Sequence, residues 1–324
     1  MLAQQRRAVV IVGMHRSGTS AVAGAINLLG AQQPNWMLQG GPSNPLGYYE
    51  AYGVIHVNDW ILRKAGSTWY DCLGFAPESL DPVTRGIAMA LINISVSVEF
   101  GDASLLLLKD PRLCLLLEYW LPMLDATHIA PTVLLVLRHP AEVIASLAKR
   151  DTFPEPLAAA TWLQHMLTAE HATRGRQRAI VSYDSLLHDW RACLDRAGQQ
   201  AGFVWPIAFD AISEQMPLRL NGGLRHHRSA AVGAGMPKPV AALMQPAFES
   251  LLALEAGDAP RHLHRLDEIS AEFTAWRLQH GRSLANELLD GHILRRLPNE
   301  VIPDEWMQLA EGVARSIGPT ATGV

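Results

Sequence analysis

The segment that decides the fold reads Gly13-Met14-His15-Arg16-Ser17-Gly18-Thr19-Ser20. It follows the apolar run Ala8–Val12 and precedes a helical pattern over Ala21–Leu29. A strand, a glycine-bounded loop and a helix together form an arrangement that cradles phosphate. Backbone N–H groups turn toward the anion, and the helix N-terminus adds partial positive charge. The sequence therefore predicts an anion-binding loop at the end of the first strand.

The residue after the second glycine separates this loop from the loops of nucleotide-hydrolysing enzymes. The spacing of Gly13 and Gly18 fits the P-loop pattern G-x-x-x-x-G, in which the next residue is a lysine that reaches the β- and γ-phosphates. Here that residue is Thr19, and the long cation of the loop is Arg16. We therefore expect the loop to hold a phosphate-like anion, and not a triphosphate with magnesium.

Composition describes a globular protein without a general affinity for polyanions. The chain has 324 residues, of which 49% are hydrophobic and 18% charged, and its formal net charge of −4 makes a nucleic-acid polymer an unexpected partner. The cysteines Cys72, Cys114 and Cys193 lie too far apart to suggest a zinc site or a disulfide framework. No metal site is expected, and a reducing cytoplasm is the predicted compartment. The sequence has no run of 18 apolar residues, which predicts that no segment spans a membrane.

Three further apolar runs are expected to be buried parallel strands. They are Ser104–Leu108, Thr132–Leu137 and Ala179–Ser182, and each is short and lacks the alternation of a half-buried strand. Each run precedes a helical pattern, and these patterns cover Leu113–Leu124, Ala141–Lys149 and Ser185–Ala201. Repeated strand–helix units predict an α/β fold, with a P-loop-like, doubly wound parallel sheet flanked by helices.

The carboxyl ends of the four expected strands carry residues suited to an anionic ligand. In doubly wound sheets, ligands bind outside these ends. Here the ends carry Arg16, Lys109, Arg138 and Tyr183. This convergence predicts a single site built from all four strands.

Two regions of the chain lie outside the strand–helix repeat. Residues 31–102 form an insertion of helices and loops, and another helix is expected over Phe153–Arg174. We expect residues 1–235 to form the α/β domain and residues 236–324 to form a helical C-terminal extension.

Four elements together resemble the sulfotransferase superfamily, over roughly residues 8–205. Residues 13–20 resemble the loop that binds the 5′-phosphosulfate of the donor, 3′-phosphoadenosine 5′-phosphosulfate (PAPS). Arg138 at a strand end, with Ser146 eight residues later, resembles the 3′-phosphate motif.

The other two elements are less complete matches. Val181–Leu187 resembles the Y-E-D-L-L segment, in which the tyrosine lies near the adenine; Tyr183 matches, whereas Asp184 and Ser185 depart from the pattern. Leu108–Arg112 resembles the K-D-P segment of a branch that includes tyrosylprotein sulfotransferases and many bacterial carbohydrate or small-molecule enzymes.

The resemblance implies a PAPS-dependent sulfotransferase that sulfates an acceptor hydroxyl and releases 3′-phosphoadenosine 5′-phosphate (PAP), with no metal required. Residues implied to bind the donor are His15, Arg16, Ser17, Gly18, Thr19, Ser20, Arg138, Ser146 and Tyr183, with Arg225 and Arg228 as a basic lid over the 3′-phosphate. Lys109 and Arg16 are expected to neutralise charge on the bridging oxygen. Glu50, in the segment Asn44–Glu50, is expected to accept the hydroxyl proton.

Other interpretations stay open at this point. A small-molecule or nucleoside kinase of the P-loop class would use Asp110 as a magnesium ligand. A non-catalytic nucleotide-binding or assembly protein would use the helices after residue 236 to form a homodimer. The acceptor could be a carbohydrate, a glycolipid or a secondary metabolite. Lesser candidates for the base are His56, Asp110 and His226, and the tryptophans that could line an acceptor cleft are Trp36, Trp60, Trp69 and Trp162.

Overall fold

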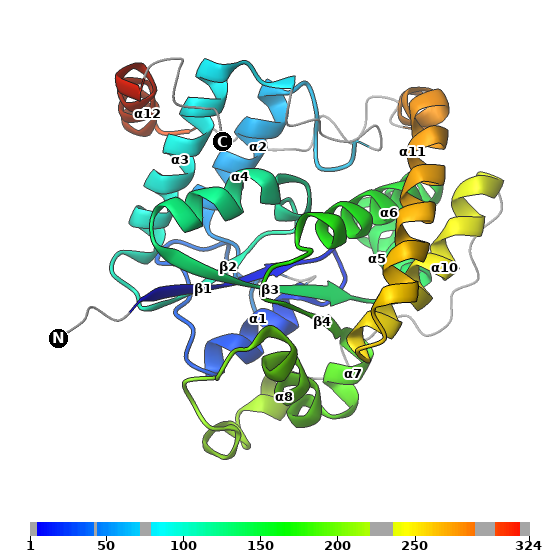
Figure 1. The fold of residues 1–324 in the computed structure, drawn as a ribbon, viewed down its shortest axis with the longest axis horizontal. Helices are drawn as coiled ribbons and strands as arrows, with labels where there is room; N and C mark the ends of the chain where they lie inside the picture. Colours follow the sequence, from blue (N-terminus) through cyan, green and yellow to red (C-terminus); the bar gives the residue numbers. More distant parts are fainter. Residues whose placement is uncertain (1–4, 42–43, 72–78, 221–235, 289–301, 318–324) are drawn as a thin grey trace.

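A four-stranded parallel sheet in the order β2-β1-β3-β4 forms the centre of the protein (Figure 1). The computed structural model describes residues 5–41, 44–71, 79–220, 236–288 and 302–317. The strands are β1 (Arg6–Val12), β2 (Leu105–Lys109), β3 (Ile129–Leu137) and β4 (Arg178–Ser182). All four predicted strands are confirmed, and each pairing between them is parallel.

Both faces of the sheet are covered, which explains why the strands read as continuous apolar runs. In β1, Val9 and Ile11 point into one hydrophobic core, whereas Val10 and Val12 point into the other, and all four are fully buried. A strand that is buried on both faces needs no polar alternation. The predicted α/β fold with a parallel sheet flanked by helices is confirmed.

The helices form one layer on each side of the sheet (Figure 1). One layer holds α1 (Thr19–Leu28), α7 (Tyr183–His188) and α8 (Trp190–Ala201). The other holds α2 (Tyr52–Lys64), α3 (Pro82–Phe100), α4 (Leu113–Ala126), α5 (Pro140–Asp151) and α6 (Glu155–Ala172). Two short helices follow α8, namely η2 (Phe209–Ile212) and α9 (Met216–Arg219).

The sheet has a switch point between its two central strands. β1 and β3 are neighbours, and the helices that follow them, α1 and α5, pack into opposite cores. The two connections therefore diverge at the carboxyl ends of these strands. Ligands bind at such crevices in doubly wound sheets.

The prediction of one continuous helix over Ser185–Ala201 is wrong. The segment forms two helices, α7 and α8, which are separated at Asp189. The backbone of Asp189 is extended, with φ −148° and ψ 91°, and its carboxylate accepts a hydrogen bond from the Ala192 backbone N–H at 3.0 Å. An aspartate in this position is a strong helix N-cap. The cap starts a new helix at Trp190 and redirects the chain.

The described residues after residue 236 form α10 (Lys238–Glu255), α11 (Pro260–Leu288) and α12 (Asp304–Ile317). Leu243 of α10 and Phe273 of α11 belong to the same hydrophobic core as one face of the sheet. The carboxylate of Glu255 accepts a hydrogen bond from the backbone N–H of Ser182, at the end of β4, at 3.0 Å. These helices therefore share a core with the α/β part, whereas α12 packs against α3 on the other side (Figure 1).

Helix α3 is long and apolar enough to cross a membrane by length and composition alone. In the fold it packs against α2, α4 and α12. Core helices of globular proteins have the same composition, and this packing accounts for the apolar side chains of α3.

Candidate active site

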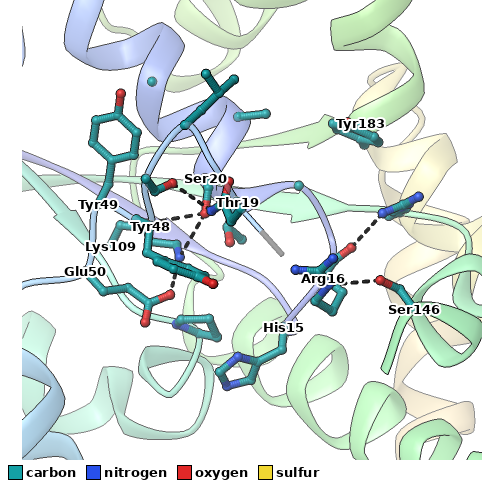
Figure 2. Close-up of a pocket in the computed structure, with 18 of the residues that line it drawn as sticks. His15, Arg16, Thr19, Ser20, Tyr48, Tyr49, Glu50, Lys109, Ser146 and Tyr183 are labelled. Carbon is teal, nitrogen blue, oxygen red and sulfur yellow. Dashed lines mark hydrogen bonds and ion pairs between the residues drawn. The ribbon is translucent and has the colours of Figure 1, made fainter. Parts of the chain in front are cut away.

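A pocket of about 660 Å³ opens at the carboxyl ends of the strands (Figure 2). Ten of the predicted site residues line it: His15, Arg16, Gly18, Thr19, Ser20, Glu50, Lys109, Arg138, Ser146 and Tyr183. The side chain of Ser17 is buried and turned away from it. Arg225, Arg228 and His226 lie outside the described residues. Among the predicted residues, the pocket brings together positions that lie up to 168 apart, from His15 to Tyr183.

Positive charge dominates the pocket wall. The described residues that line it include six cations, Arg16, Lys109, Arg138, Lys149, Arg150 and Arg219, and one carboxylate, that of Glu50. The formal excess is five positive charges, in a chain whose net charge is −4. Such a wall attracts a ligand with several negative charges.

Three of these cations were not among the predicted site residues. Lys149 and Arg150 follow Ser146 on α5 by three and four residues, a spacing that places side chains on one helix face. That spacing was available as a signal in the sequence. Arg219, at the end of α9, had no comparable signal.

The loop after β1 owes its shape to two glycines and one strained residue. A Cβ on Gly13 would lie 2.6 Å from the carbonyl oxygen of Val136, so glycine is needed for the close approach of β3. Gly18 is the N-cap of α1 with φ 91°, and the ring of Tyr183 occupies the space that a Cβ would need. Arg16 has φ 70°, which is uncommon for a side chain with a Cβ. Left-handed residues in such a loop turn backbone N–H groups toward a common anion.

Cys114, in the first turn of α4, contacts the backbone of this loop. The backbone N–H of Gly13 donates to the sulfur of Cys114 at 3.1 Å. Burial raises the pKa of the Cys114 thiol to about 12. Cys114 and Cys193 are free and buried, and Cys72 lies outside the described residues.

Arg16 joins the two anion sites that the sequence predicted separately. Its Nε donates to the hydroxyl oxygen of Ser146 at 2.9 Å, and its carbonyl oxygen accepts from Nη1 of Arg138 at 3.0 Å (Figure 2). The Nε of Arg138 pairs with Glu142 at 2.9 Å, and its guanidinium lies 5.0 Å from the centre of the Tyr183 ring. One end of the pocket is therefore a connected group of two arginines, a serine and a tyrosine.

Glu50 and Lys109 form the other end of the pocket. The Lys109 ammonium and the Glu50 carboxylate are in direct contact, and both residues are buried (Figure 2). The Lys109 ammonium also lies 3.5 Å from the hydroxyl of Ser20. Glu50 is held by a backbone hydrogen bond from Leu38 to its carbonyl oxygen at 2.8 Å, and by the left-handed turn at Tyr49, with φ 58°.

Asp110 follows Lys109 in the chain, but its side chain is buried in the protein interior. It is fully buried, and its carboxylate accepts from the backbone N–H of Arg112 at 2.7 Å and from the Arg112 guanidinium at 3.2 Å. Burial raises the pKa of Asp110 to about 6. Arg112 in turn pairs with Asp59 at 2.6 Å. Asp110 therefore supports the strand end from inside and does not line the pocket.

The ring of His15 packs against the ring of Trp69. Burial, followed by the nearby positive charge of Arg112, holds the pKa of His15 well below its usual value. The rings of His15 and Trp69 have centroids 4.4 Å apart. Trp60, Trp69 and Trp162 are buried, and Trp36 is exposed. None of these tryptophans is among the described residues that line the pocket, and neither is His56.

Comparison with solved structures gives a distant similarity. No family model matches the sequence, and no curated protein matches it. The chain is similar to the sulfotransferase domain of the olefin synthase from Synechococcus PCC 7002, with 16% sequence identity and a TM-score of 0.38, over 72% of this chain and 93% of that domain. A similarity of this size carries no conclusion about activity or ligand.

Proposed function

We propose that the protein transfers a sulfuryl group from PAPS to an acceptor hydroxyl. The observation that carries the proposal is the pocket at the switch point of the sheet, with its formal excess of five positive charges. It is built on a glycine loop with Thr19 in place of the lysine that triphosphate-binding loops use. PAPS carries a phosphate at one end and a phosphosulfate at the other, so it needs cations at both ends of one pocket.

The two ends of the pocket suit the two ends of the donor. We assign the 5′-phosphosulfate to the backbone of residues 13–20, and the 3′-phosphate to the group of Arg16, Arg138 and Ser146. Guanidinium groups form paired hydrogen bonds with phosphate oxygens, and a helix serine adds another donor. Lys149 and Arg150 extend this phosphate site by one helical turn. Tyr183 offers its ring to the adenine.

The chemistry is assigned to the opposite end of the pocket. The acceptor oxygen bonds to sulfur while the bond from sulfur to the bridging phosphate oxygen breaks, and that oxygen keeps the electron pair. Glu50 accepts the proton of the acceptor hydroxyl. Lys109 donates a hydrogen bond to the leaving oxygen and neutralises the charge that develops there. The remaining rate enhancement comes from positioning of the two reactants, as in phosphoryl transfer.

The kinase alternative is disfavoured by the surroundings of Asp110. A kinase of this fold class would direct a strand-end carboxylate at magnesium beside the phosphates. The carboxylate of Asp110 is instead fully buried and bonded to Arg112. The acceptor class stays open among a carbohydrate, a glycolipid and a secondary metabolite, and a screen of hydroxyl acceptors with labelled PAPS would identify it.

Calorimetric binding of PAP and of adenosine 5′-phosphate tests the assignment of the donor site. We expect the protein to bind PAP, and we expect Arg138→Ala to weaken PAP binding strongly while sparing adenosine 5′-phosphate. The matched control is Arg176→Ala, because Arg176 pairs with Asp125 at the amino end of the sheet, at 2.7 Å. Lack of PAP binding by the wild-type protein would refute the proposed function. Equal losses for both nucleotides would refute the assignment of the 3′ site.

A further inference from the structure

We propose that the contact between Lys109 and Glu50 is a latch that the 5′-phosphosulfate of the donor opens. While the latch is closed, the Glu50 carboxylate is paired with Lys109. Lys109 is then not at the leaving oxygen, where sulfuryl transfer needs it. Donor binding draws Lys109 away and releases Glu50 to act on the acceptor. The proposal rests on the proposed function and adds to it a coupling between donor occupancy and the state of the base.

The first observation is the closed state itself. The Lys109 ammonium contacts Oε1 of Glu50, and the two side chains are only 1% and 9% exposed. Few water molecules can therefore compete for either charge, and the ion pair is stronger than one at the surface. Both residues nevertheless line the pocket, so a ligand can reach them.

The second observation is that Lys109 already lies between two partners. Its ammonium is 3.5 Å from the hydroxyl of Ser20, in the first turn of α1. The Ser20 hydroxyl itself donates to the carbonyl oxygen of Tyr48 at 3.3 Å, which links α1 to the segment that carries Glu50. A small movement of the Lys109 ammonium toward α1 would bring it to an anion held by the loop and remove it from Glu50.

The closed state cannot be the reacting state. A carboxylate paired with an ammonium is a weak base, because the cation stabilises its ionised form. Transfer also requires Lys109 at the leaving oxygen, on the far side of the sulfur from the acceptor. Once Lys109 has moved, the Glu50 carboxylate is no longer paired with that cation and can accept a hydrogen bond from the acceptor hydroxyl. The base therefore becomes available when the 5′-phosphosulfate is in place.

Comparison of PAPS with adenosine 3′-phosphate isolates the 5′-phosphosulfate, because the two share the adenosine and the 3′-phosphate and differ in the 5′ group that Lys109 would reach. We measure the affinity of each nucleotide by calorimetry, without acceptor, for the wild-type protein and for Glu50→Gln. Breaking the latch opposes PAPS binding only, so Glu50→Gln should tighten PAPS by about tenfold and change adenosine 3′-phosphate by less than about twofold. Glu99→Gln is the matched control, because Glu99 is equally buried and does not line the pocket; it should change neither affinity.

A double-mutant cycle separates the latch from simple repulsion between Glu50 and the sulfonate. If the latch operates, the gain in PAPS affinity caused by Glu50→Gln disappears in a Lys109→Gln background. Repulsion alone would leave the gain intact, and that result would overturn the latch. Equal effects of Glu50→Gln on PAPS and adenosine 3′-phosphate, or weaker PAPS binding, would also overturn it.

Two further outcomes keep the test decisive. Failure of the wild-type protein to bind either nucleotide would overturn the proposed function, and the latch with it, whereas binding of both with no tightening would overturn the latch alone. If Glu50→Gln does not fold, Glu50→Asp withdraws the carboxylate by one methylene. It should tighten PAPS by about threefold and leave adenosine 3′-phosphate unchanged.

Discussion

The contact between Gly18 and Tyr183 makes Gly18→Ala the most demanding test of the loop structure. Gly18 caps α1 in a left-handed conformation, with φ 91°. The ring of Tyr183 packs directly over its Cα, in the space that a Cβ would need. Alanine at this position therefore meets two separate penalties, one from the backbone and one from packing.

The structure lets the two penalties be estimated separately. A left-handed backbone costs a residue with a Cβ about 1 kcal/mol. Forcing a methyl group into a packed site adds about 2 kcal/mol. We therefore expect Gly18→Ala to lower the free energy of unfolding by about 3 kcal/mol. Gly66 is the matched control, because it has φ 68° and no atom within 4 Å of its added Cβ, so Gly66→Ala should cost about 1 kcal/mol.

Urea unfolding of five proteins checks this reasoning. They are the wild type, Gly18→Ala, Gly66→Ala, Tyr183→Ala and the double variant with Tyr183→Ala and Gly18→Ala. In the Tyr183→Ala background, the packing penalty should vanish and Gly18→Ala should cost about 1 kcal/mol, as it does at Gly66. An equal cost at Gly18 and Gly66, or an unchanged cost at Gly18 without the Tyr183 ring, would refute the packing that places Tyr183 at the pocket.

Other sites give three more predictions. Burial lowers the pKa of His165 from 6.5 to about 4, so its stabilising contribution is complete above pH 6.5 and is lost as the pH falls toward 4. Urea unfolding across this range should show a loss of about 3 kcal/mol in the wild type that His165→Gln lacks. Arg150→Gln should weaken PAP binding by about tenfold in calorimetry, whereas Arg176→Gln should not change it. Asp189→Ala should lower the free energy of unfolding by about 1 kcal/mol, and Asp189→Asn by much less, because asparagine also caps helices.

The sheet could be predicted because its signals are local. Each strand is a short apolar run, and each run is followed by a helical pattern within a few residues. The glycine loop was predictable for the same reason, because Gly13 and Gly18 stand in one short segment between an apolar run and a helical pattern. The break at Asp189 was missed because Ser185–Ala201 has one helical pattern throughout, and a polar residue inside it is not recognisable as a cap without the backbone.

The connections within the site could not be predicted, because they depend on contacts between distant residues. The hydrogen bond from Arg16 to Ser146 spans 130 positions, and the contact from Glu50 to Lys109 spans 59. Both depend on how the loops after neighbouring strands pack. The sequence indicated the chemical types at the strand ends, but it assigned Arg16 to the sulfate end, whereas its guanidinium reaches the Ser146 end. Arg219 enters the pocket only because α9 packs against α1.

The bonds around Arg16 suggest why a strained residue is kept in the loop. A left-handed arginine costs about 1 kcal/mol of backbone energy. Its carbonyl oxygen accepts from Arg138 and its Nε donates to Ser146, so two bonds from β3 and α5 hold the conformation that the backbone alone disfavours. The loop is thereby fixed in an anion-binding shape before any ligand arrives, and a ligand need not supply the ordering energy. Arg16 follows β1, whereas its partners Arg138 and Ser146 follow β3, across the switch point. The loop therefore keeps this shape only while the two halves of the sheet are packed together.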